Sequence, residues 1–600
     1  MPKRRRVPTE NASLFLIESG DLFLRDNQLE SALACYTKAQ CFAPNASLMR
    51  RLYNNLGVTY KRLGRLQEAK KTFLQGITLD ASHGSFYSNL GAIYALQGNT
   101  DQAVAYFEKA LRLHVKLADA LKLVELYSHA NRIRHALGLG EELLRRFPDQ
   151  YDVHVALGNV YALLKQFDKA LPYYEKAVSL APQKTQALNN LGIAYKELGL
   201  NEKALAAYQK VIELHPNDSA VYNNLGNLLR QTGAFEQAFK ALSHSIKLNP
   251  SYADAYSNVG ALFKEQKMYD KAEPYYQKAL QMEPNHINAN FDTALLALVK
   301  GNYEEGWRRY EYRLAMKELL AKTHAYKTPL WKGEPLKDKT IVLQNEQGFG
   351  DNIMFIRYAQ KFLEAGAHVI VRTRPDLVRL FQTADARLEV IDEESSSIPA
   401  HDFYLPLLCS AQRFATTLET IPQEFPYLFV PKSKIDVALS PDRMKIGIVW
   451  SSSPTNKDFK NKHIGLNAYR SWFGLEGIQW ISLHVGDEAK DIAREGLSDT
   501  IVDISPVLSD FYETAKVMMH LDLVITTDTA VAHLCGALNV PVWVLTPKPA
   551  DWRWMQEGDT TPWYQSVKVF RQTVSGDWSV PIAAVFKALE TMLKTAEKSA

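Results

Sequence analysis

The sequence predicts an α-solenoid of helical hairpins followed by an α/β region with two parallel sheets. A glycine recurs every 34 residues in the first half of the chain, with one gap of 67, and short apolar runs alternate with helical stretches after Lys339. Such a period is typical of units that bury their apolar faces only against their neighbours. Short apolar runs between helices are typical of buried parallel strands. The 600 residues, 46% of them hydrophobic, are enough for several domains.

The repeat is specific at positions beyond the glycine. An alanine follows each glycine after twelve residues, an aromatic residue follows most of them after sixteen, and a proline closes several units. Small residues let two helices approach closely, the aromatic side chain fills the space between them, and proline ends the second helix. The repeating glycines are Gly57, Gly91, Gly158, Gly192, Gly226 and Gly260. This is the pattern of the tetratricopeptide helical hairpin, and it predicts about eight repeats over residues 13–286.

Both ends of the array depart from the pattern. Residues 287–338 begin as a ninth unit but carry large aromatic residues, among them Trp307 and Tyr310, where small ones are usual. Because terminal repeats are atypical, we interpret this segment as a capping hairpin and a linker. Residues 1–12 contain a basic run from Lys3 to Arg6, and we expect a disordered basic start there. A nuclear or membrane-surface address is the alternative interpretation of that run.

Charge and cysteine content narrow the class of protein. The net charge of +4 gives no argument for a nucleic-acid partner. No stretch approaches the ~18 apolar residues of a membrane span, and no signal-peptide pattern follows Met1. The four cysteines lack the spacing of a metal site or a disulfide framework. We therefore expect a reduced, cytoplasmic protein without a membrane span, and peripheral membrane association stays open.

Apolar runs predict strands in two successive series. The first series, in residues 339–432, lies at 339–344, 368–372 and 388–391, with a helix at about 351–365. The second, in residues 433–575, lies at 445–450, 480–483, 521–525 and 542–545. Residues 576–600 are expected to form a closing helix, because Val585, Leu589 and Leu593 have helical spacing. Two such Rossmann-like halves place a ligand crevice at the carboxyl ends of their strands.

Three motifs follow predicted strands at that crevice. In the first, Gly348 and Gly350 precede Asp351 at the start of a helix. The glycines allow a tight turn and a close approach of backbone amides to a ligand. The alternative is that Asp351 only caps the helix, since aspartate is a good N-cap residue.

The second motif is a polar cluster where a strand ends and a helix begins. It consists of Thr526, Thr527, Asp528, Thr529 and His533. Thr529 and His533 are four residues apart, which predicts one helix face, and the free amides of the first turn would receive a diphosphate. A histidine alone in such a position can equally be a core or capping residue, but the whole cluster favours binding.

The third motif is a polar loop after the first strand of the second series. It offers Ser451 and Ser453 at the strand end, and Lys460 and Lys462 further along. Hydroxyls and ammonium groups suit a pyrophosphate leaving group, whose developing charge needs stabilisation. A solvated charged loop is the alternative interpretation.

Further motifs extend over the rest of the C-terminal region. They are Glu346–Asp351, Phe355–Tyr358, Asp528–Leu534, Gly536–Leu538, Pro549–Trp554, Pro562–Tyr564, Phe570–Gln572 and Gly576–Trp578, with Gly306–Trp307 and Tyr310–Arg313 in the cap. With these motifs, residues 339–580 resemble the glycosyltransferase domain that is fused to tetratricopeptide arrays in many bacterial proteins. That domain is similar to the heptosyltransferases of lipopolysaccharide synthesis, in glycosyltransferase family 9, and the whole chain is similar in layout to O-GlcNAc transferase.

The resemblance implies a GT-B enzyme that moves a sugar from a nucleotide-sugar donor to an acceptor hydroxyl. It implies that Asp351 is the general base and that Asp528, Thr529 and His533 line the donor diphosphate. The loop from Ser451 to Lys462 would complete the phosphate site. Relatives often carry histidine and arginine in that loop, whereas this chain has Asn456 and two lysines. Lysine keeps the charge but lacks the bidentate phosphate geometry of arginine.

The sequence also bears on cofactors. It contains no Asp-x-Asp motif, by which the other glycosyltransferase architecture holds a metal ion on the diphosphate. We therefore expect a metal-independent enzyme without a cofactor, in which helix amides and lysines replace the cation. The aromatic segment of Trp552, Trp554, Trp563 and Tyr564 is either a wall for stacking a sugar or base, or a packed seam between the two sheets.

Three functions remain open on the sequence. In the preferred one, the array binds a protein acceptor, such as flagellin or another surface protein, and the C-terminal region glycosylates its Ser or Thr, because repeat grooves suit extended peptides and partner helices. The second is a transferase that acts on lipopolysaccharide or another glycan. The third is a tetratricopeptide scaffold with an inactive transferase-like domain.

Overall fold

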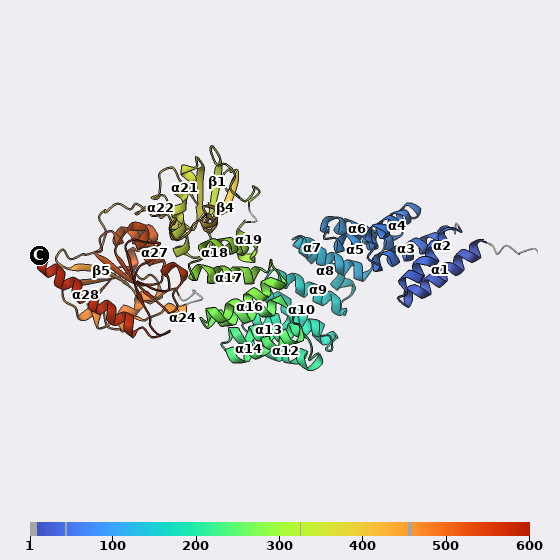
Figure 1. Cartoon of the computed structure of the whole chain (residues 1–600), viewed down its shortest axis with the longest axis horizontal. Coiled ribbons are helices and arrows are strands. Elements are labelled where there is room, and N and C mark those ends of the chain that lie inside the picture. Colours follow the sequence, from blue (N-terminus) through green and yellow to red (C-terminus); the bar gives the residue numbers. More distant parts are fainter. Residues whose placement is uncertain (1–8, 43–44, 324–325, 396, 454–458, 600) are drawn as a thin grey trace, which may run out of the picture. The chain divides into compact units, whose positions relative to one another are not determined.

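The computed structural model describes residues 9–42, 45–323, 326–395, 397–453 and 459–599 (Figure 1). Contacts divide the chain into two compact units, residues 1–250 and residues 251–600.

The first unit is a run of antiparallel helical hairpins, coloured blue to green in Figure 1. Its helices are α1 (Thr9–Arg25), α2 (Leu29–Gln40), α3 (Ala46–Arg62), α4 (Leu66–Leu79), α5 (Gly84–Leu96), α6 (Thr100–Leu113), α7 (Leu117–His129), α8 (Ile133–Arg146), α9 (Tyr151–Leu163), α10 (Phe167–Leu180), α11 (Thr185–Glu197), α12 (Asn201–Leu214), α13 (Ser219–Gln231) and α14 (Phe235–Leu248). The predicted solenoid is confirmed. Because α1 starts at Thr9, the expected disorder of residues 1–12 is wrong for its last four residues.

The repeating glycines are explained by close packing inside each hairpin. A Cβ atom added at Gly192 would lie 2.5 Å from a ring carbon of Tyr208 on the second helix. Gly57 and Gly158 meet Phe73 and Tyr174 in the same way. No larger residue fits beside the aromatic ring, so the glycine and the aromatic residue sixteen positions later form one packing unit.

The second unit begins with two more helical hairpins and continues into the α/β region. Its helices are α15 (Ala253–Glu265), α16 (Tyr269–Met282), α17 (Ile287–Val299), α18 (Tyr303–Tyr310), α19 (Lys317–Thr323), α20 (Phe349–Phe355), α21 (Ala359–Glu364), α22 (Pro375–Phe381), α23 (Ser410–Arg413), α24 (Phe459–Lys462), α25 (Asp491–Arg494), α26 (Phe511–Met518), α27 (Ala530–Leu538) and α28 (Ser579–Ser599). The hairpin of α17 and α18 is the predicted cap. A short 3₁₀ helix, η1 (Glu311–Ala315), follows it.

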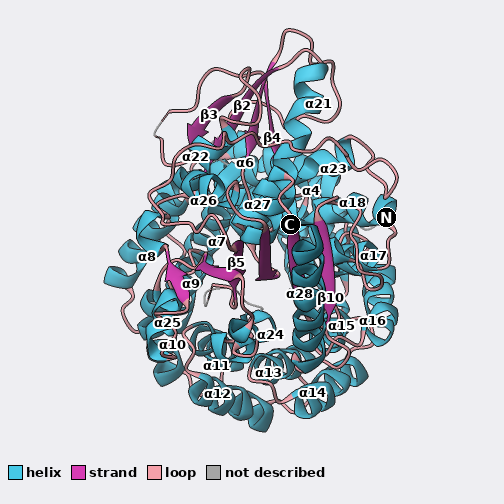
Figure 2. Cartoon of the chain, turned by 90° about the vertical axis from the view of Figure 1, so that its left-hand side faces the viewer, coloured by secondary structure: helices cyan, strands magenta, loops and turns pink. Residues whose placement is uncertain are grey.

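Two parallel sheets form the α/β region. Their strands are β1 (Thr340–Gln344), β2 (His368–Thr373), β3 (Glu389–Asp392), β4 (Phe403–Pro406), β5 (Met444–Val449), β6 (Ile478–Ser482), β7 (Ile501–Asp503), β8 (Leu523–Thr527), β9 (Val542–Thr546) and β10 (Val567–Arg571). The strand order is β3-β2-β1-β4 in the first sheet and β10-β9-β8-β5-β6-β7 in the second, with every pairing parallel. Figure 2 shows β2 and β3 near α21 and α22, and α28 along β10.

The strands expected from apolar runs are confirmed, and three others were missed. The missed strands β4 and β7 are only four and three residues long. The missed strand β10 is at the edge of its sheet and carries Lys568 and Arg571, which interrupt the apolar run. Short or charged edge strands bury too little apolar surface to give the continuous pattern of a central parallel strand.

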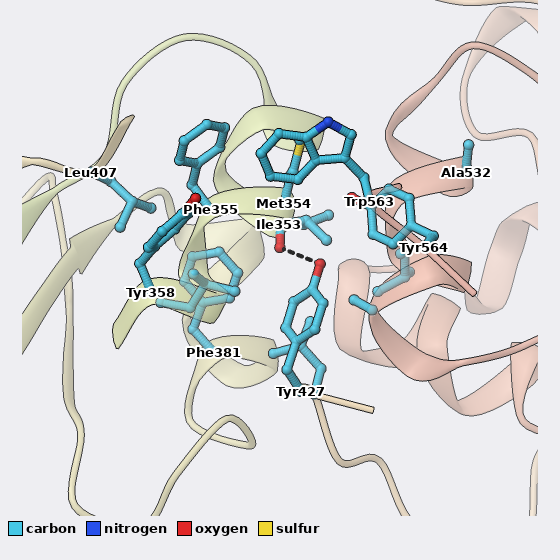
Figure 3. Packing of buried hydrophobic residues seen from close by; sticks show 14 of the residues in the cluster. Ile353, Met354, Phe355, Tyr358, Phe381, Leu407, Tyr427, Ala532, Trp563 and Tyr564 are labelled. Carbon is cyan, nitrogen blue, oxygen red and sulfur yellow. Dashed lines mark hydrogen bonds between the residues drawn. The ribbon is translucent and has the colours of Figure 1, made fainter. Parts of the chain in front are cut away.

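One hydrophobic core joins the cap to both sheets. It contains Trp307 of α18, Phe355 of α20 and Trp563 of the second half, and Trp307 stacks edge-on against both of the others. Figure 3 shows Trp563 and Tyr564 beside Ile353, Met354 and Phe355 of α20. The tryptophan-rich segment is almost fully buried. It is therefore the packed seam, and a wall for stacking a ligand was the wrong alternative.

Candidate functional site

The polar motifs lie where each sheet changes the direction of its strand order. In the first sheet this point is between β1 and β4, and in the second it is between β5 and β8. Neighbouring connections run to opposite sides there, and the carboxyl ends of the strands at such a point are where open parallel sheets usually bind ligands. Asp351 follows β1, the serine-rich loop follows β5, and Asp528 follows β8. The topology therefore brings the three motifs of the sequence to the ends of switch-point strands.

The loop after β1 holds Asp351 in the first turn of α20. Gly348 is the N-cap residue, and its amide donates to the Asp351 carboxylate at 3.2 Å. Asp351 is therefore the third helical residue and not the N-cap itself. The left-handed residue of this turn is Gln347, with φ +56°, so the turn does not depend on the conformational freedom of either glycine.

An arginine from the second half reaches Asp351. Arg553 pairs with the Asp351 carboxylate through Nη2 and with Asp551 through Nη1 at 2.7 Å. Its guanidinium lies over the ring of Trp552, 4.2 Å from the ring centre. The side chains of Arg553 and Asp351 are 12% and 17% exposed, so the pair is largely shielded from water. Sequence analysis gave Arg553 no role, although it is the only cation in an otherwise aromatic run.

A second ion pair crosses from the loop after β5 to the end of β8. The Lys462 ammonium lies 2.6 Å from the Asp528 carboxylate, which is 6% exposed. Burial by itself would raise the pKa of Asp528, but Lys462 holds that pKa below its usual range. Lys462 and Asp528, both predicted from the sequence to bind phosphate, are thus brought together. The Asp528 carboxylate is ionised, and it orients the Lys462 ammonium.

The other residues of the serine-rich loop have different surroundings. The buried Ser451 hydroxyl is 2.9 Å from Nδ1 of His463, a residue that sequence analysis did not select. Ser453 is exposed. Asn456 and the side chain of Lys460 lie outside the described residues, so their predicted roles stay predictions.

A buried histidine after β6 fixes the end of β5. His484 Nε2 accepts a hydrogen bond from the Trp450 amide at 2.9 Å, and the two rings lie in contact at an interplanar angle of 52°, with centres 4.0 Å apart. Burial lowers the pKa of His484 to about 3, so it stays neutral and keeps accepting. His484 therefore holds the backbone just before Ser451.

The predicted helix after Asp528 begins one residue later than the motif suggested. Thr529 is the N-cap of α27 with an extended backbone, and its hydroxyl lies 3.0 Å from that of Thr526. The expectation that Thr529 and His533 share a helix face is wrong, because Thr529 precedes the helix. Thr527 is fully buried and its hydroxyl has no partner among the described residues.

His533 lies inside the packed seam. It is 4% exposed, its Nδ1 is 2.8 Å from the Tyr564 hydroxyl, and its ring lies tilted against that of Trp554, with centres 5.0 Å apart. A Cβ added at Gly350 would lie 2.6 Å from His533 Cδ2. Helix packing between α20 and α27 therefore accounts for Gly350, for which sequence analysis gave the approach of a ligand as the reason.

Buried polar atoms without a partner gather at the carboxyl ends of the strands. In the described part of the chain they include Nδ2 of Asn345, Oγ of Ser452 and the hydroxyls of Thr373, Thr527 and Thr546. Buried polar groups are normally hydrogen-bonded, and each one left unpaired costs about 1–3 kcal/mol. A polar ligand or water in the crevice would supply the missing partners. Asn345, Thr373 and Thr546 carry no motif signal in the sequence.

The described residues contain neither a candidate metal-binding cluster nor a candidate membrane-spanning helix. They contain no group of three or more His, Cys, Asp or Glu side chains arranged to hold a metal ion. Within the same residues, we find no helix with the length and hydrophobicity that crossing a bilayer requires.

Gly350→Ala is expected to lower the free energy of unfolding of the second unit by about 1–3 kcal/mol, because its methyl group would overlap His533. The matched control is Gly348→Ala, whose Cβ would have only an ordinary contact with Asp351 at 3.5 Å. All ten tryptophans lie between Trp307 and Trp578, so urea unfolding followed by tryptophan fluorescence reports this unit. Equal stability of the two variants would contradict the packing role of Gly350.

Acidification is expected to destabilise the second unit through His533. Burial lowers the pKa of His533 from 6.5 to about 4. The unfolded chain binds the proton first, so this contribution is complete above pH 6.5 and falls, by roughly 3 kcal/mol, as the pH drops towards 4. His533→Gln should flatten the dependence. Because carboxylates titrate below pH 5 in both proteins, the difference between them in tryptophan-monitored unfolding is the measurement. Parallel curves would contradict the burial argument.

Comparisons with known protein families identify part of the helical region. Family models described as tetratricopeptide repeat or TPR repeat match residues 51–83, 85–114, 149–217, 207–240, 226–267 and 253–286. These matches identify the helical hairpins within residues 51–83, 85–114 and 149–286 as tetratricopeptide repeats.

Three curated proteins are similar in sequence. Protein FlbA of Caulobacter vibrioides is 25% identical over 332 residues, which cover 50% of this chain and 54% of FlbA. The human Protein O-mannosyl-transferase TMTC1 is 30% identical over 186 residues, 30% of this chain and 20% of that protein. The human Protein O-mannosyl-transferase TMTC2 is 30% identical over 98 residues, 16% and 12% of the two chains. The chain thus spans about half of the first relative and less of the others.

Solved structures of tetratricopeptide repeat proteins are similar to part of this chain. A tetratricopeptide repeat protein from Parabacteroides merdae is 19% identical and covers 48% of this chain and 99% of that chain, with a TM-score of 0.32. YrrB, described as a TPR protein with an unusual peptide-binding site, is 21% identical and covers 37% and 98%, with a TM-score of 0.22.

Proposed function

We propose that this protein is a glycosyltransferase of GT-B architecture that moves a sugar from a nucleotide-sugar donor to a Ser or Thr hydroxyl of a protein acceptor. The observation that carries the proposal is the placement of Asp351, the Lys462–Asp528 pair and unpartnered hydroxyls at the carboxyl ends of switch-point strands in two parallel sheets. Likeness to two human proteins named as protein O-mannosyl-transferases supports the same class of reaction.

The residues of the crevice suit the steps of this reaction. The Asp351 carboxylate, oriented by Arg553, takes the proton of the acceptor hydroxyl as its oxygen bonds to the anomeric carbon of the sugar. The bond from that carbon to the diphosphate oxygen breaks, and the nucleoside diphosphate leaves with the electron pair. Lys462, held by Asp528, faces the growing negative charge together with the Thr527 hydroxyl and the first amides of α27.

The proposed reaction needs no metal ion. A lysine and oriented backbone amides can neutralise the negative charge of a diphosphate in place of a metal ion. Transfer should then persist in EDTA. Loss of transfer on chelation, restored by Mg²⁺ or Mn²⁺, would contradict this part of the proposal.

The repeat array is proposed to recruit the protein acceptor. Asparagines on the first helices of successive hairpins join side chain to side chain, from Asn190 to Asn159 and from Asn224 to Asn189, both at 2.9 Å. An amide side chain both donates and accepts, so such a row can pair with the backbone of an extended peptide. The acceptor class, with flagellin or another surface protein as an example, remains a proposal.

The test has two stages. Nucleotides of uridine, guanosine, adenosine and cytidine are first compared for the thermal shift they give in tryptophan fluorescence, which reports the second unit. The protein is then incubated with matching nucleotide sugars and with candidate protein or glycan acceptors, and products are weighed by intact-mass spectrometry. Transfer to a protein supports the proposal. Transfer only to lipopolysaccharide or another glycan overturns the acceptor class, and nucleotide binding without any transfer points to an inactive scaffold.

A further inference from the structure

The loop that carries Asp351 has a backbone conformation that needs contacts from other parts of the chain to be stable. Gln347, in the middle of the loop, has φ +56°, a left-handed conformation that glutamine does not favour. Strained residues of this kind persist only where surrounding groups fix them. The groups that fix this loop come in part from the cap, at the end of α18 and in η1.

Arg313 of η1 holds the residue before Gln347. Its Nε and Nη2 donate to the two carboxylate oxygens of Glu346 at 2.8 and 2.7 Å, and the Leu408 amide donates to the same carboxylate at 2.9 Å. The side chains of Arg313 and Glu346 are 4% and 3% exposed. A bidentate buried pair fixes both the position and the orientation of the carboxylate. Glu346 is thus fixed between the cap and the end of β4.

Tyr310, the last residue of α18, holds Gln347 itself. The Gln347 side chain amide donates to the Tyr310 hydroxyl at 2.7 Å. Arg313 in turn donates to the Tyr310 carbonyl at 2.9 Å, and its guanidinium lies 4.4 Å from the centre of the Tyr310 ring. Tyr310 is 2% exposed and packs edge-on against Trp307. The two cap residues therefore form one rigid support under consecutive residues of the loop.

Besides the Arg553 pair with Asp351, the loop has further contacts from its own half of the α/β region. The side chain of Asn352 donates to the carbonyls of Glu346 and Gly348, each at 2.7 Å, and Arg374 donates to the Gln347 carbonyl at 2.7 Å. These contacts hold the backbone of the loop. The side chains of Glu346 and Gln347 are held by the cap and by the Leu408 amide. Asp351 lies four residues after Gln347, and its carboxylate accepts a hydrogen bond from the Gly348 amide.

We propose that Tyr310 and Arg313 are positioning residues that set the place of the Asp351 carboxylate, so that the cap, residues 287–338, is a working part of the transferase site. This proposal rests on the proposed function for the role of Asp351. A displacement of a reacting group by about 1 Å can cost on the order of 100-fold in rate. Contacts that fix the loop therefore act on turnover more than on donor binding.

The test uses Tyr310→Phe in the full chain, because it removes only the hydroxyl that accepts from Gln347 and keeps the buried ring. The matched control is Tyr303→Phe. Tyr303 lies on the same helix, is equally buried, and its hydroxyl accepts a hydrogen bond from Trp563 Nε1 at 2.9 Å without contact to the loop. Each variant thus loses one buried hydrogen bond to a tyrosine hydroxyl.

Hydrogen exchange of the amides of residues 346–352, measured by mass spectrometry, is the first readout and needs no activity. Loss of one net hydrogen bond corresponds to roughly a 5-fold faster exchange. We expect that increase in Tyr310→Phe and none in Tyr303→Phe. Unchanged exchange of the loop in Tyr310→Phe, or an equal increase in both variants, overturns the proposal.

Transfer kinetics give the second readout. With the donor and acceptor found above, Tyr310→Phe should lower kcat about 10-fold and leave the donor KM within about 2-fold, as expected for a group that acts only on positioning. Tyr303→Phe should keep both. Faster exchange with an unchanged kcat overturns the positioning role. If the wild-type protein transfers no sugar at all, the proposed function fails, and exchange alone then decides whether the cap holds the loop.

Discussion

Asp351→Asn is expected to lower the rate of sugar transfer by about 10²–10⁴-fold, the usual contribution of a general base, while nucleotide binding stays nearly unchanged. The amide keeps the size of the side chain and can still accept from the Gly348 amide, so the loop should keep its shape. It cannot accept the proton of the acceptor hydroxyl. Steady-state transfer and the nucleotide thermal shift are measured side by side.

The control for this prediction separates base catalysis from the loss of an ion pair. Asp551 binds the same guanidinium of Arg553, at 2.7 Å, but follows β9 and has no place at the end of β1. Asp551→Asn should therefore cost less than about 10-fold in rate, as for loss of a partly exposed charge pair. If both variants lose activity equally, Asp351 serves to hold Arg553, and its assignment as the base is wrong.

Arg357→Met is expected to lower the free energy of unfolding of the second unit by about 3–5 kcal/mol, because it removes a charged hydrogen-bond donor from the core. Arg357 is 5% exposed and donates to the carbonyls of Met354 and Trp563 at 2.8 and 3.0 Å. It also donates to the Tyr427 hydroxyl at 3.0 Å, and Figure 3 shows that hydroxyl bound in turn to the Ile353 carbonyl. The two sheets and their link meet at this one guanidinium.

Two further variants sharpen the stability prediction. Arg357→Lys should recover little of the loss, because a lysine cannot reproduce the planar fork of donors. Arg379→Met removes an arginine with two ion pairs, to Asp510 and Glu513, whose side chain is 50% exposed, and should cost less than about 1 kcal/mol. Urea unfolding by tryptophan fluorescence compares all three variants. A wild-type midpoint for Arg357→Met would show that packing around the guanidinium, and not its hydrogen bonds, holds the seam.

Local pattern predicted much of the fold. The glycines of the repeat and the aromatic residues sixteen positions later reported the close helix contacts seen at Gly192 and Tyr208. Central strands such as β1, β5 and β8 appeared as apolar runs because both of their faces are buried. The edge strand β10 was missed, since Lys568 and Arg571 interrupt its apolar run. The sequence could not decide whether the tryptophan-rich segment is a packed seam or a wall for stacking a ligand, because burial in a core and stacking on a ligand favour the same residue types.

The sequence predicted where the candidate site lies, at the ends of particular strands, but not which of its residues contact one another. The sequence analysis selected Asp351, Lys462 and Asp528, since polar residues after buried strands meet at one edge of a parallel sheet. It could not pair Asp351 with Arg553, which is 202 residues away, or Lys462 with Asp528. It also interpreted Gly350 as a point of ligand approach, whereas the helix packed against it is what leaves no room for a side chain.

By itself the sequence determined the class of each region, because a 34-residue period and buried apolar runs arise from neighbours along the chain. It also determined which strand ends carry polar residues. Only the tertiary structure decided which of those residues support one another. The Asp351 loop is held by Arg313 and Tyr310 of the cap, and Asp351 itself is met by Arg553 of the second half. Hydrogen bonds and ion pairs act over a few ångströms in space, whatever the separation along the chain, so only folding brings these partners within reach.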